Sequence, residues 1–419
     1  MSVPAPRSTR PPLLPLDEAL AQLLGGVTSL GRTETVNTVD ADGRVLAQEL
    51  VSALQVPALD NSSMDGYAMR CADVRQAGMV LKVSQRIAAG SQEAGAGLRL
   101  AAGTVARIFT GAPIPPGADA VVPQEECEAM TEPDGHVRIQ QIPMAGQWIR
   151  RAGEDVRKGT TVLHLGHRLN PASLGLAASI GFDRLRVAAR PRVALFSTGD
   201  ELVMPGEVAP AQMRPGAIYN SNRFFLRAML QRLGCDVTDC GIVPDQRVAT
   251  ELALSSASES HDLILTSGGV SVGEEDHIKP AVQALGTLDL WQIAIKPGKP
   301  FAHGRVGSAH FIGLPGNPVS SFVTFMLLVR PVILKLQGAT ALDRSAIPTR
   351  ASFNWKKPDR RREFLRVRRN ASGELELFEN QSSGVLTSSV WGDGLVDVAP
   401  GRVITAGEPV PYLPFAELL

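Results

Sequence analysis

Cysteine, net charge and long apolar runs are all scarce in this 419-residue sequence. The four cysteines, Cys71, Cys127, Cys235 and Cys240, are too scattered for a disulfide framework or a zinc knuckle, so we expect free thiols. Lys plus Arg and Asp plus Glu each number 42, so the attraction that drives duplex nucleic-acid binding has no global source. The longest apolar stretch, residues 322–329, is far shorter than the ~20 residues of a membrane span. We therefore expect neither a nucleic-acid nor a membrane partner.

The first residues combine arginines with several prolines and contain no apolar stretch resembling a secretory signal, so we expect a cytoplasmic protein. At roughly 150 residues per domain, the length predicts about three domains. The 40 glycines and 30 prolines exceed the usual share but stay below the ~25–30 % that marks disorder. This excess indicates many specified turns.

Changes in the hydrophobic pattern divide the chain into four parts. Short β-rich runs over residues 54–148 lie between helical stretches at 1–53 and 149–188, so a small β module looks inserted into a discontinuous helical N-terminal domain. Residues 189–335 alternate buried strands, turns and helices, which is the pattern of a doubly wound parallel sheet. Residues 336–419 return to β-type alternation and predict a C-terminal β module. The expected fold class is multidomain, α/β plus β.

Three expected strands of the third part lead directly into glycine-bearing turns. These are strand 193–196 with its turn at 197–201, strand 263–265 with a turn from 266, and strand 311–312 with its turn at 313–318. Ligands of open parallel sheets bind outside the carboxyl ends of the strands. Glycine lets the backbone approach a ligand closely, and free N–H groups at helix starts point at an anion. A phosphate or another oxyanion is the expected guest.

The second of these turns, residues 267–273, contains three glycines and two serines and is followed by Asp276. That set suits a phosphorylated ligand with a divalent cation, although a tight turn with a capping Asp is an alternative. No Gly-Lys-Ser/Thr follows and the turn does not match Gly-x-Gly-x-x-Gly, which disfavours P-loop and nicotinamide sites. Mg²⁺ needs only one or two carboxylates plus substrate phosphates. Candidates are Asp200, Glu201, Asp245 and Asp276, each of which could instead cap a helix.

The turn Lys296-Pro-Gly-Lys-Pro300 holds two cations between prolines. A helix N-terminus contributes at most ~2 kcal/mol toward an anion, whereas micromolar binding requires ~8 kcal/mol. A lysine about 4 Å from a charge adds up to ~4 kcal/mol. Lys296 and Lys299 are therefore candidate oxyanion ligands, with solvated surface lysines as the alternative. We interpret the seven histidines as structural or surface residues.

Taken together, seven strings in this order resemble the molybdopterin molybdenumtransferase family, which includes MoeA and the gephyrin E domain. The strings are Asp60-Asn-Ser-Ser-Met-Asp-Gly-Tyr-Ala68, Thr110-Gly-Ala-Pro113 with Gly117-Ala-Asp-Ala-Val-Val122, residues 150–155, Ser197-Thr-Gly-Asp-Glu-Leu202, residues 267–273 with Asp276, Lys296-Pro-Gly-Lys-Pro300, and Leu314-Pro-Gly-Asn-Pro-Val-Ser320. The resemblance implies the final step of molybdenum cofactor synthesis. Adenylylated molybdopterin and molybdate react, AMP leaves, and molybdenum is placed on the dithiolene.

The resemblance also implies roles for individual residues. Catalytic roles fall to Asp60, Asp155, Asp245, Asp276 and Lys296. Magnesium ligands would be Asp245, Asp276 and Glu201, and molybdate contacts would be Lys296, Lys299, Ser320 and Arg366. The pterin and nucleotide would contact Thr110, Ser197, Thr198, Gly199, Asp200, Glu201, Ser267, Gly268, Gly269, Ser271, Gly273, Pro315, Gly316, Asn317 and Pro318.

Members of this family are elongated homodimers in which the partner's β module completes the cleft, so the resemblance implies a homodimer. A molybdopterin adenylyltransferase and molybdoenzyme apoproteins are further partners that it implies. Two departures concern molybdate placement: Gln292, where many relatives carry a basic residue, and residues 391–394. Two alternatives stay open, an adenylyltransferase acting one step earlier and a non-catalytic scaffold of the same fold.

Overall fold

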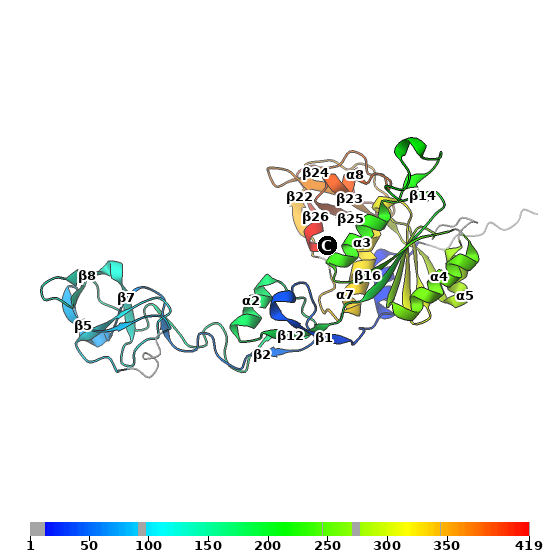
Figure 1. The fold of residues 1–419 in the computed structure, drawn as a ribbon. Coiled ribbons are helices and arrows are strands. Elements are labelled where there is room, and N and C mark those ends of the chain that lie inside the picture. Colours follow the sequence, from blue (N-terminus) through cyan, green and yellow to red (C-terminus); the bar gives the residue numbers. More distant parts are fainter. Residues whose placement is uncertain (1–12, 91–97, 245, 270–276, 344, 419) are drawn as a thin grey trace, which may run out of the picture.

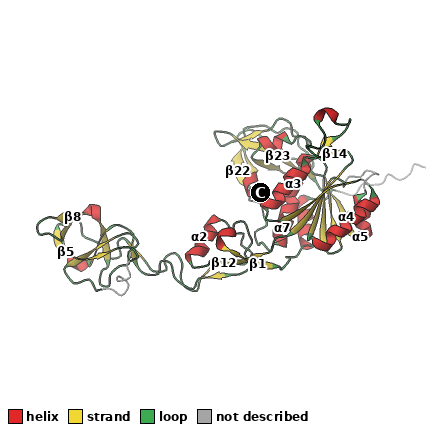
Figure 2. Cartoon of the chain, in the orientation of Figure 1, coloured by secondary structure: helices red, strands yellow, loops and turns green. Residues whose placement is uncertain are grey.

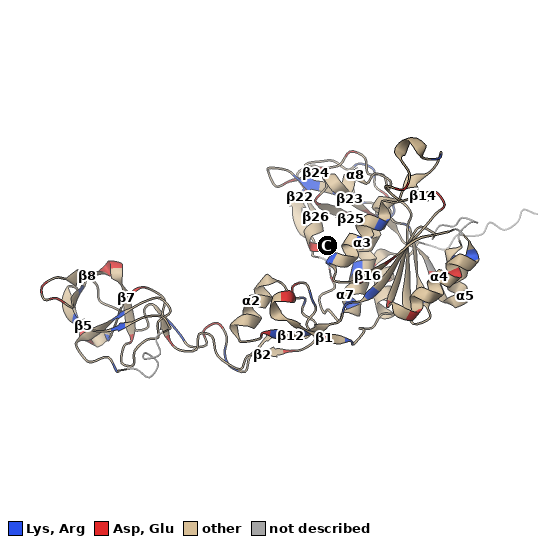
Figure 3. Ribbon diagram, viewed as in Figure 1, with Lys and Arg blue, Asp and Glu red and all other residues tan. Residues whose placement is uncertain are grey.

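The computed structural model describes residues 13–90, 98–244, 246–269, 277–343 and 345–418. The chain is elongated (Figure 1), with a small β module at one end and two packed modules at the other. A thin connecting region joins the two ends. Lys and Arg positions are interspersed with Asp and Glu positions along the whole length (Figure 3), as the balanced composition requires.

A six-stranded sheet organises the largest module. Its strand order is β16-β13-β17-β21-β20-β18. The first four strands are parallel, whereas β20 and β18 run antiparallel to their neighbours. The expectation of a parallel sheet is thus met in four strands, and the sheet as a whole is mixed. The strands are β13 (Arg192–Thr198), β16 (Asp236–Val243), β17 (Leu263–Ser267), β18 (Gly286–Gln292), β20 (Pro300–Val306) and β21 (Ala309–Leu314).

Helices cover both faces of this sheet (Figure 2). On one face lie α3 (Asn222–Arg232), α6 (Pro318–Thr324) and α7 (Arg330–Leu336), and on the other lie α4 (Arg247–Ser260) and α5 (Ile278–Leu285). The central strands β17 and β21 are buried at every position, because both faces of the sheet are covered. This sandwich fixes the carboxyl ends of β13, β17 and β21 side by side.

One helical run, Pro318–Leu336, is long and apolar enough to cross a membrane by length and composition. It comprises α6, a π-helical segment at Phe325–Val329, and α7. Inside this protein 89 % of its apolar window is buried. The apolarity is therefore accounted for by its place in the core beneath the sheet.

The helical N-terminal domain expected from the sequence is mostly strand and loop. Helix α1 (Leu16–Gly25) exists, but its apolar residues pack into the core of the α/β module, against α7. The connecting region holds α2 (Pro171–Ser179) and antiparallel strand pairs. Proceeding outward, these pairs are β1 (Thr33–Asn37) with β12 (Arg184–Ala188), β2 (Leu50–Val51) with β11 (Thr161–Leu163), and β3 (Asn61–Ser62) with β10 (Ile149–Arg150).

The β module at the far end is a six-stranded sheet with small cores on both faces. Its strand order is β7-β4-β6-β5-β9-β8. The strands are β4 (Gly66–Met69), β5 (Met79–Ile87), β6 (Thr104–Ile108), β7 (Ala120–Pro123), β8 (Cys127–Met130) and β9 (His136–Ile139). The chain enters and leaves this module through the adjacent strands β3 and β10.

The C-terminal module packs beside the α/β module. Its sheet has the order β19-β23-β25-β26-β22, with β24 paired to β23. The members are β19 (Ile295–Lys296), β22 (Ile347–Arg350), β23 (Arg362–Arg369), β24 (Leu375–Leu377), β25 (Gly394–Val398) and β26 (Pro409–Pro414), with short helices α8 (Thr387–Trp391) and α9 (Phe415–Leu418). Strand β19 comes from the α/β part of the sequence, so the lysine turn begins on the edge of the C-terminal sheet.

Candidate active site

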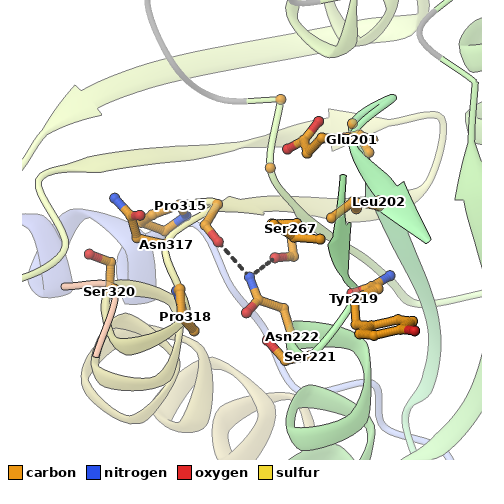
Figure 4. Close-up of a pocket in the computed structure, with 18 of the residues that line it drawn as sticks. Glu201, Leu202, Tyr219, Ser221, Asn222, Ser267, Pro315, Asn317, Pro318 and Ser320 are labelled. Atoms are coloured by element: carbon orange, nitrogen blue, oxygen red, sulfur yellow. Dashed lines mark hydrogen bonds between the residues drawn. The ribbon is translucent and has the colours of Figure 1, made fainter. Parts of the chain in front are cut away.

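A cavity of about 790 Å³ lies at the carboxyl ends of β13, β17 and β21 (Figure 4). All three glycine turns predicted from the sequence contribute to its wall. The lining residues are Thr198, Gly199, Glu201, Leu202, Ile218, Tyr219, Asn220, Ser221, Asn222, Ser267, Gly268, Gly269, Pro300, Pro315, Gly316, Asn317, Pro318, Ser320 and Gly384. Ligand cavities typically enclose roughly 300–1,000 Å³, so this one has room for a nucleotide-sized guest.

The turn after β17 requires glycine at two consecutive positions. Gly268 and Gly269 have φ values of +95° and +66°, a region that side chains rarely adopt. A Cβ on Gly268 would lie 2.7 Å from the backbone oxygen of Thr198, and one on Gly269 would lie 2.6 Å from Cγ1 of Ile278. Gly268 thus lets its turn approach the backbone of the turn after β13, and Gly269 leaves room for the Ile278 side chain.

One side chain ties the turns together. Asn222, at the start of α3, donates from Nδ2 to Ser267 Oγ at 2.8 Å and to the carbonyl oxygen of Gly316 at 2.7 Å. Figure 4 shows Asn222 between these two partners, with Asn317, Pro318 and Ser320 toward one end of the cavity and Glu201 toward the other. The second and third turns therefore keep a fixed separation.

Two buried polar atoms of the cavity wall have no hydrogen-bond partner in the described part of the chain. They are Thr198 Oγ1 and Asn220 Nδ2. Leaving a buried polar group unpaired typically costs ~1–3 kcal/mol. A ligand that brings an acceptor for the Asn220 amide, or a partner for the Thr198 hydroxyl, would recover that energy.

The predicted magnesium ligands are only partly placed. Asp245, Asp276, Ser271 and Gly273 lie outside the described residues. Glu201 lines the cavity, and a Cβ at Gly199 would lie 2.5 Å from its carboxylate Oε2, so glycine leaves room for this carboxylate. Among the residues that the structure describes, no three His, Cys, Asp or Glu side chains gather as a ready metal site. A carboxylate oxygen beside a phosphate-sized space still suits Mg²⁺, which takes one or two protein carboxylates.

The lysine turn lies at the boundary with the C-terminal module. Its last residue, Pro300, lines the cavity, whereas Lys296 and Lys299 do not. Lys296 Nζ forms ion pairs with Glu363 Oε1 at 2.9 Å and Asp359 Oδ2 at 3.4 Å. Glu363 is only 2 % exposed and also accepts from Trp355 Nε1. The Lys296 charge is therefore already compensated in this structure. Lys299 is partly exposed and has no ion pair within the described ranges.

A third cation at this boundary escaped the sequence analysis. Arg361 binds Asp359 with both a side-chain and a backbone N–H, and these bonds hold the pKa of that carboxyl well below its usual value. Lys296 contacts the same carboxylate. Arg361 thus brings a guanidinium to the lysine turn from the C-terminal module.

Arg366, predicted to contact molybdate, does not line the cavity. It is 1 % exposed, and its guanidinium donates to Phe364 O, Ser382 O and Ser388 Oγ. All its charged nitrogens are thus engaged inside the C-terminal module, so direct contact with an oxyanion is not what this geometry provides. Burial is the reason, and burial of an arginine on a strand is invisible in the sequence.

The predicted residues of the β-module region are far from the cavity of their own chain (Figure 1). Asp60 accepts from the Ala152 backbone N–H at 2.8 Å and from Arg151 at 2.7 Å, and these bonds lower its pKa. Thr110 donates from its hydroxyl and its backbone N–H to Asp65. Asp155 also lies on the connecting loops, where its backbone N–H donates to Val56 O.

Of the residues predicted for the three turns, most line the cavity, whereas Ser197 and Asp200 do not. The sequence analysis missed a second group of lining residues, which come from the segment containing β14 (Leu202–Val203) and β15 (Ile218–Tyr219), from α3 and from the C-terminal module. No motif marks them. The pairing of β14 with β15 could be found only from the apolar residues of two very short strands.

The structure shows where the two departures from the family pattern lie. Gln292 ends β18, and its carbonyl oxygen accepts from the Leu14 backbone N–H. Trp391 packs edge to face on Phe378 with ring centres 5.2 Å apart, and the Arg368 guanidinium lies 4.5 Å from its ring centre. Neither residue lines the cavity.

Family models match the chain in three consecutive stretches. These are the MoeA N-terminal region (domain I and II) over residues 14–181, the probable molybdopterin binding domain over residues 194–335, and the MoeA C-terminal region (domain IV) over residues 348–415. The cavity lies almost entirely within the second stretch, and Gly384 comes from the third.

Whole-length relatives point the same way. The molybdopterin molybdenumtransferase of Haemophilus influenzae is 39 % identical over 97 % of this chain and 100 % of its own length. Molybdopterin molybdenumtransferase 2 of Mycobacterium tuberculosis is 36 % identical over 88 % of this chain and 91 % of its own. A crystal structure of the molybdopterin biosynthesis moeA protein from Pyrococcus horikoshii superposes with a TM-score of 0.80 at 26 % identity, over 96 % of this chain and 100 % of that one.

Proposed function

This chain belongs to the molybdopterin molybdenumtransferase family, and from that membership we propose how its cavity and turns divide the work of molybdenum insertion. The protein is a transferase of molybdenum cofactor biosynthesis. In the proposed reaction, adenylylated molybdopterin and molybdate are the substrates. The phosphoanhydride is cleaved, AMP leaves, and molybdenum is transferred to the dithiolene.

The observation that carries the proposal is a cavity whose wall combines glycine turns with unpaired buried polar atoms. Gly268 and Gly269 let the turn after β17 pack closely against Thr198 and Ile278, and this packing places their backbone in the cavity wall. Thr198 Oγ1 and Asn220 Nδ2 lack partners and supply hydrogen bonds to the guest. Asn222 holds Ser267 in place, so the wall is ordered before the substrate arrives.

Mg²⁺ is proposed to be held by Glu201 together with Asp245 and Asp276, of which only Glu201 lies among the described residues. The ion would neutralise charge on the phosphoanhydride oxygens when it is bound. Glu201 is the charged member of the described part of the wall, and Gly199 leaves space for its carboxylate.

Molybdate is proposed to bind where Ser320 and the lysine turn meet. Ser320 is 4 % exposed and lines the cavity. Pro300, the residue that follows Lys299 in the chain, lines the cavity too. Lys296, Lys299 and Arg361 bring three positive charges against two negative charges on Asp359 and Glu363. The surplus attracts a dianion, and Lys296 would exchange part of its ion pairing for the ligand.

A homodimer is proposed to complete the cleft, because the β module and the connecting region, which contain Asp60, Thr110 and Asp155, lie at the other end of the chain from the α/β module that holds the cavity (Figure 1). We further propose that the protein works in the cytoplasm, takes its substrate from a molybdopterin adenylyltransferase and delivers its product to molybdoenzyme apoproteins.

Replacing Asp276 tests the catalytic assignment. We expect Asp276→Ala to fold normally, to retain binding of the adenylylated pterin, and to lose AMP release. The measurement is AMP formation from the adenylylated pterin with molybdate and Mg²⁺. Asp236→Ala is the matched control, because Asp236 is an exposed carboxylate at the opposite edge of the same sheet. Wild-type AMP release by Asp276→Ala would remove the assignment.

A further inference from the structure

Residues 355–363 of the C-terminal module form a strongly basic segment. Five of these nine residues are basic and two are acidic, whereas the whole chain has 42 basic residues in 419 and a formal net charge of +0. The basic residues are Lys356, Lys357, Arg360, Arg361 and Arg362. Positive charge is therefore concentrated in this segment of a chain that is neutral as a whole.

Two of the five cations hold the basic segment in place. Arg361 donates from Nε and Nη2 to the two carboxylate oxygens of Asp359, at 3.1 and 2.9 Å. Arg362 binds the two oxygens of Asp397 in the same way, both at 2.7 Å, and so ties the segment to β25. Such two-bond pairs fix orientation as well as distance. The segment therefore has a defined position on the C-terminal sheet.

The other three cations, Lys356, Lys357 and Arg360, are exposed and form no ion pair within the described ranges. A carboxylate beside them would cancel their field at close range. Without one, their charge acts on ions in the surrounding solution, over a distance that the salt concentration sets.

The basic segment lies next to one end of the cavity. Lys296 Nζ is 3.4 Å from Asp359 Oδ2, and Lys296 is paired with Glu363 where β19 meets β23. Two residues further along the lysine turn, a Cβ at Gly298 would lie 3.6 Å from the carbonyl oxygen of Ser320, which lines the cavity. Only the lysine turn separates the basic segment from this wall.

We propose that the basic segment is an electrostatic guide for the pterin nucleotide: its three unpaired cations raise the rate at which the anionic substrate reaches the cavity, and they do not contact the substrate once it is bound. The phosphoanhydride of adenylylated molybdopterin supplies the negative charge that is attracted. Surfaces of one sign beside a cleft can raise association rates roughly 10- to 1,000-fold. The inference rests on the proposed function, since it requires that the cavity take this substrate.

The size of the effect follows from charge, distance and salt. Three positive charges about 12 Å from two negative charges in water should raise the association rate about tenfold when the Debye length is about 30 Å. At physiological ionic strength, where the Debye length is about 8 Å, the same charges should give about twofold. A direct contact would instead appear mainly in the dissociation rate.

The experiment follows the binding of adenylylated molybdopterin to the full chain by stopped-flow pterin fluorescence. In the triple variant Lys356→Gln, Lys357→Gln and Arg360→Gln, we expect the association rate to fall about tenfold at ~0.01 M salt and about twofold at ~0.15 M salt. The dissociation rate should stay at its wild-type value. A higher dissociation rate with an unchanged association rate would overturn the guiding role.

A matched control removes three charges elsewhere. Arg184, Arg190 and Arg232 are exposed, and none of them lines the cavity. Replacing all three with Gln should lower the association rate less than about twofold at either salt concentration. An equal loss in this control and in the triple variant of the basic segment would show that only net charge matters, and would overturn the inference.

A charge-keeping variant tests the segment if the glutamine variant does not fold. Lys356→Arg, Lys357→Arg and Arg360→Lys together should associate at the wild-type rate, and a tenfold loss there would overturn the inference. Wild-type rates for the free substrate in the glutamine variant, with slower transfer from the adenylyltransferase, would also overturn it and assign the segment to protein docking. If the wild-type protein failed to bind the adenylylated pterin at all, the proposed function itself would be contradicted.

Discussion

The two edges of the α/β sheet differ in their residues. Charged side chains gather at the amino edge, whereas glycine turns and small polar side chains gather at the carboxyl edge. The amino edge has a smaller hollow, about 330 Å³, whose wall includes Arg32, Arg192, Glu259, His261, Asp262, Arg305 and His310. The larger cavity at the carboxyl edge has Glu201 as the charged member of its described wall. A count of charges would therefore choose the amino edge, whereas the larger cavity lies at the carboxyl edge.

The difference lies in how the polar groups are paired. Asp262 at the amino edge accepts two bonds from the Arg32 guanidinium, at 2.8 and 2.5 Å, and two more from Arg192. Arg305 contacts His310 Nε2, and His310 Nδ1 is the buried polar atom of this wall that has no partner among the described residues. At the carboxyl edge Thr198 and Asn220 keep unpaired buried atoms. Charges that satisfy one another stabilise the fold, while unpaired groups beside bare backbone are available to a ligand.

The largest expected effect comes from adding a methyl group at the carboxyl edge. In Gly268→Ala, the new Cβ would meet the Thr198 carbonyl oxygen at 2.7 Å and φ would be strained at +95°. The turns must move apart, and displacements of about 1 Å at a reacting centre can cost ~100-fold in rate. We expect at least a hundredfold fall in kcat/KM, measured as AMP release, with a substrate dissociation constant that rises in parallel.

Gly206→Ala is the matched control for this change. Gly206 has nearly the same φ, +94°, but a Cβ there would meet nothing within 4 Å. The Gly206→Ala variant should lose about 1 kcal/mol of stability from backbone strain and keep its activity. Equal activity losses in the two variants would mean that strain alone matters and that the close approach of the turns does not.

The second expected effect is on stability at the amino edge. Asp262→Asn removes the acceptor charge shared by Arg32 and Arg192, both of which are partly exposed and can recover some hydration. We expect the free energy of unfolding in urea to fall by about 2 kcal/mol, less than for a fully buried pair. The exposed Asp236→Asn should change little. If kcat/KM of Asp262→Asn fell as much as that of Gly268→Ala, the view that the amino edge stabilises the fold and the carboxyl edge binds the ligand would be contradicted.

The smallest effect is a pH dependence at the same edge. Burial, with the nearby Arg305 and His303, lowers the pKa of His310 from 6.5 to about 4. The unfolded chain therefore binds more protons below pH 6.5, and acidification weakens the fold. Between about pH 6.5 and pH 5.5 this group should contribute a loss of about 1 kcal/mol, which His310→Gln should remove. Identical urea midpoints against pH in both proteins would contradict a neutral buried His310.

The glycine turns at the carboxyl edge of the sheet could be predicted from short stretches of the sequence. Each of β13, β17 and β21 is an apolar run that ends in a glycine turn, and both features are visible within ten residues. The antiparallel pairing at one end of the sheet could not be predicted, because an apolar stretch such as that of β18 indicates a strand but not the direction in which it runs relative to its neighbours. Helix α1 was found by its spacing, yet its packing partner, α7, lies about 300 residues away in the chain.

The charged residues of the candidate site were harder to place for the same reason. Lys296 and Arg366 are both basic residues on strands, and the sequence offers nothing that distinguishes them. Lys296 meets Glu363 through the pairing of β19 with β23, and Arg366 is buried because residues 378–388 fold over it. Ion pairs and burial that depend on nonlocal strand pairing cannot be derived from local pattern.

The nested strand pairs of the connecting region give the far β module an unusual independence. Ser62 and Ile149 are neighbours across one strand pair, so the points where the chain departs and comes back are about 5 Å apart. The residues between them are connected to the rest of the molecule through this pair of strands, and the apolar clusters described in the module include no residue of the half that contains the cavity. Such a cassette can be remodelled, lengthened or exchanged in evolution while the half that carries the cavity keeps its own core intact.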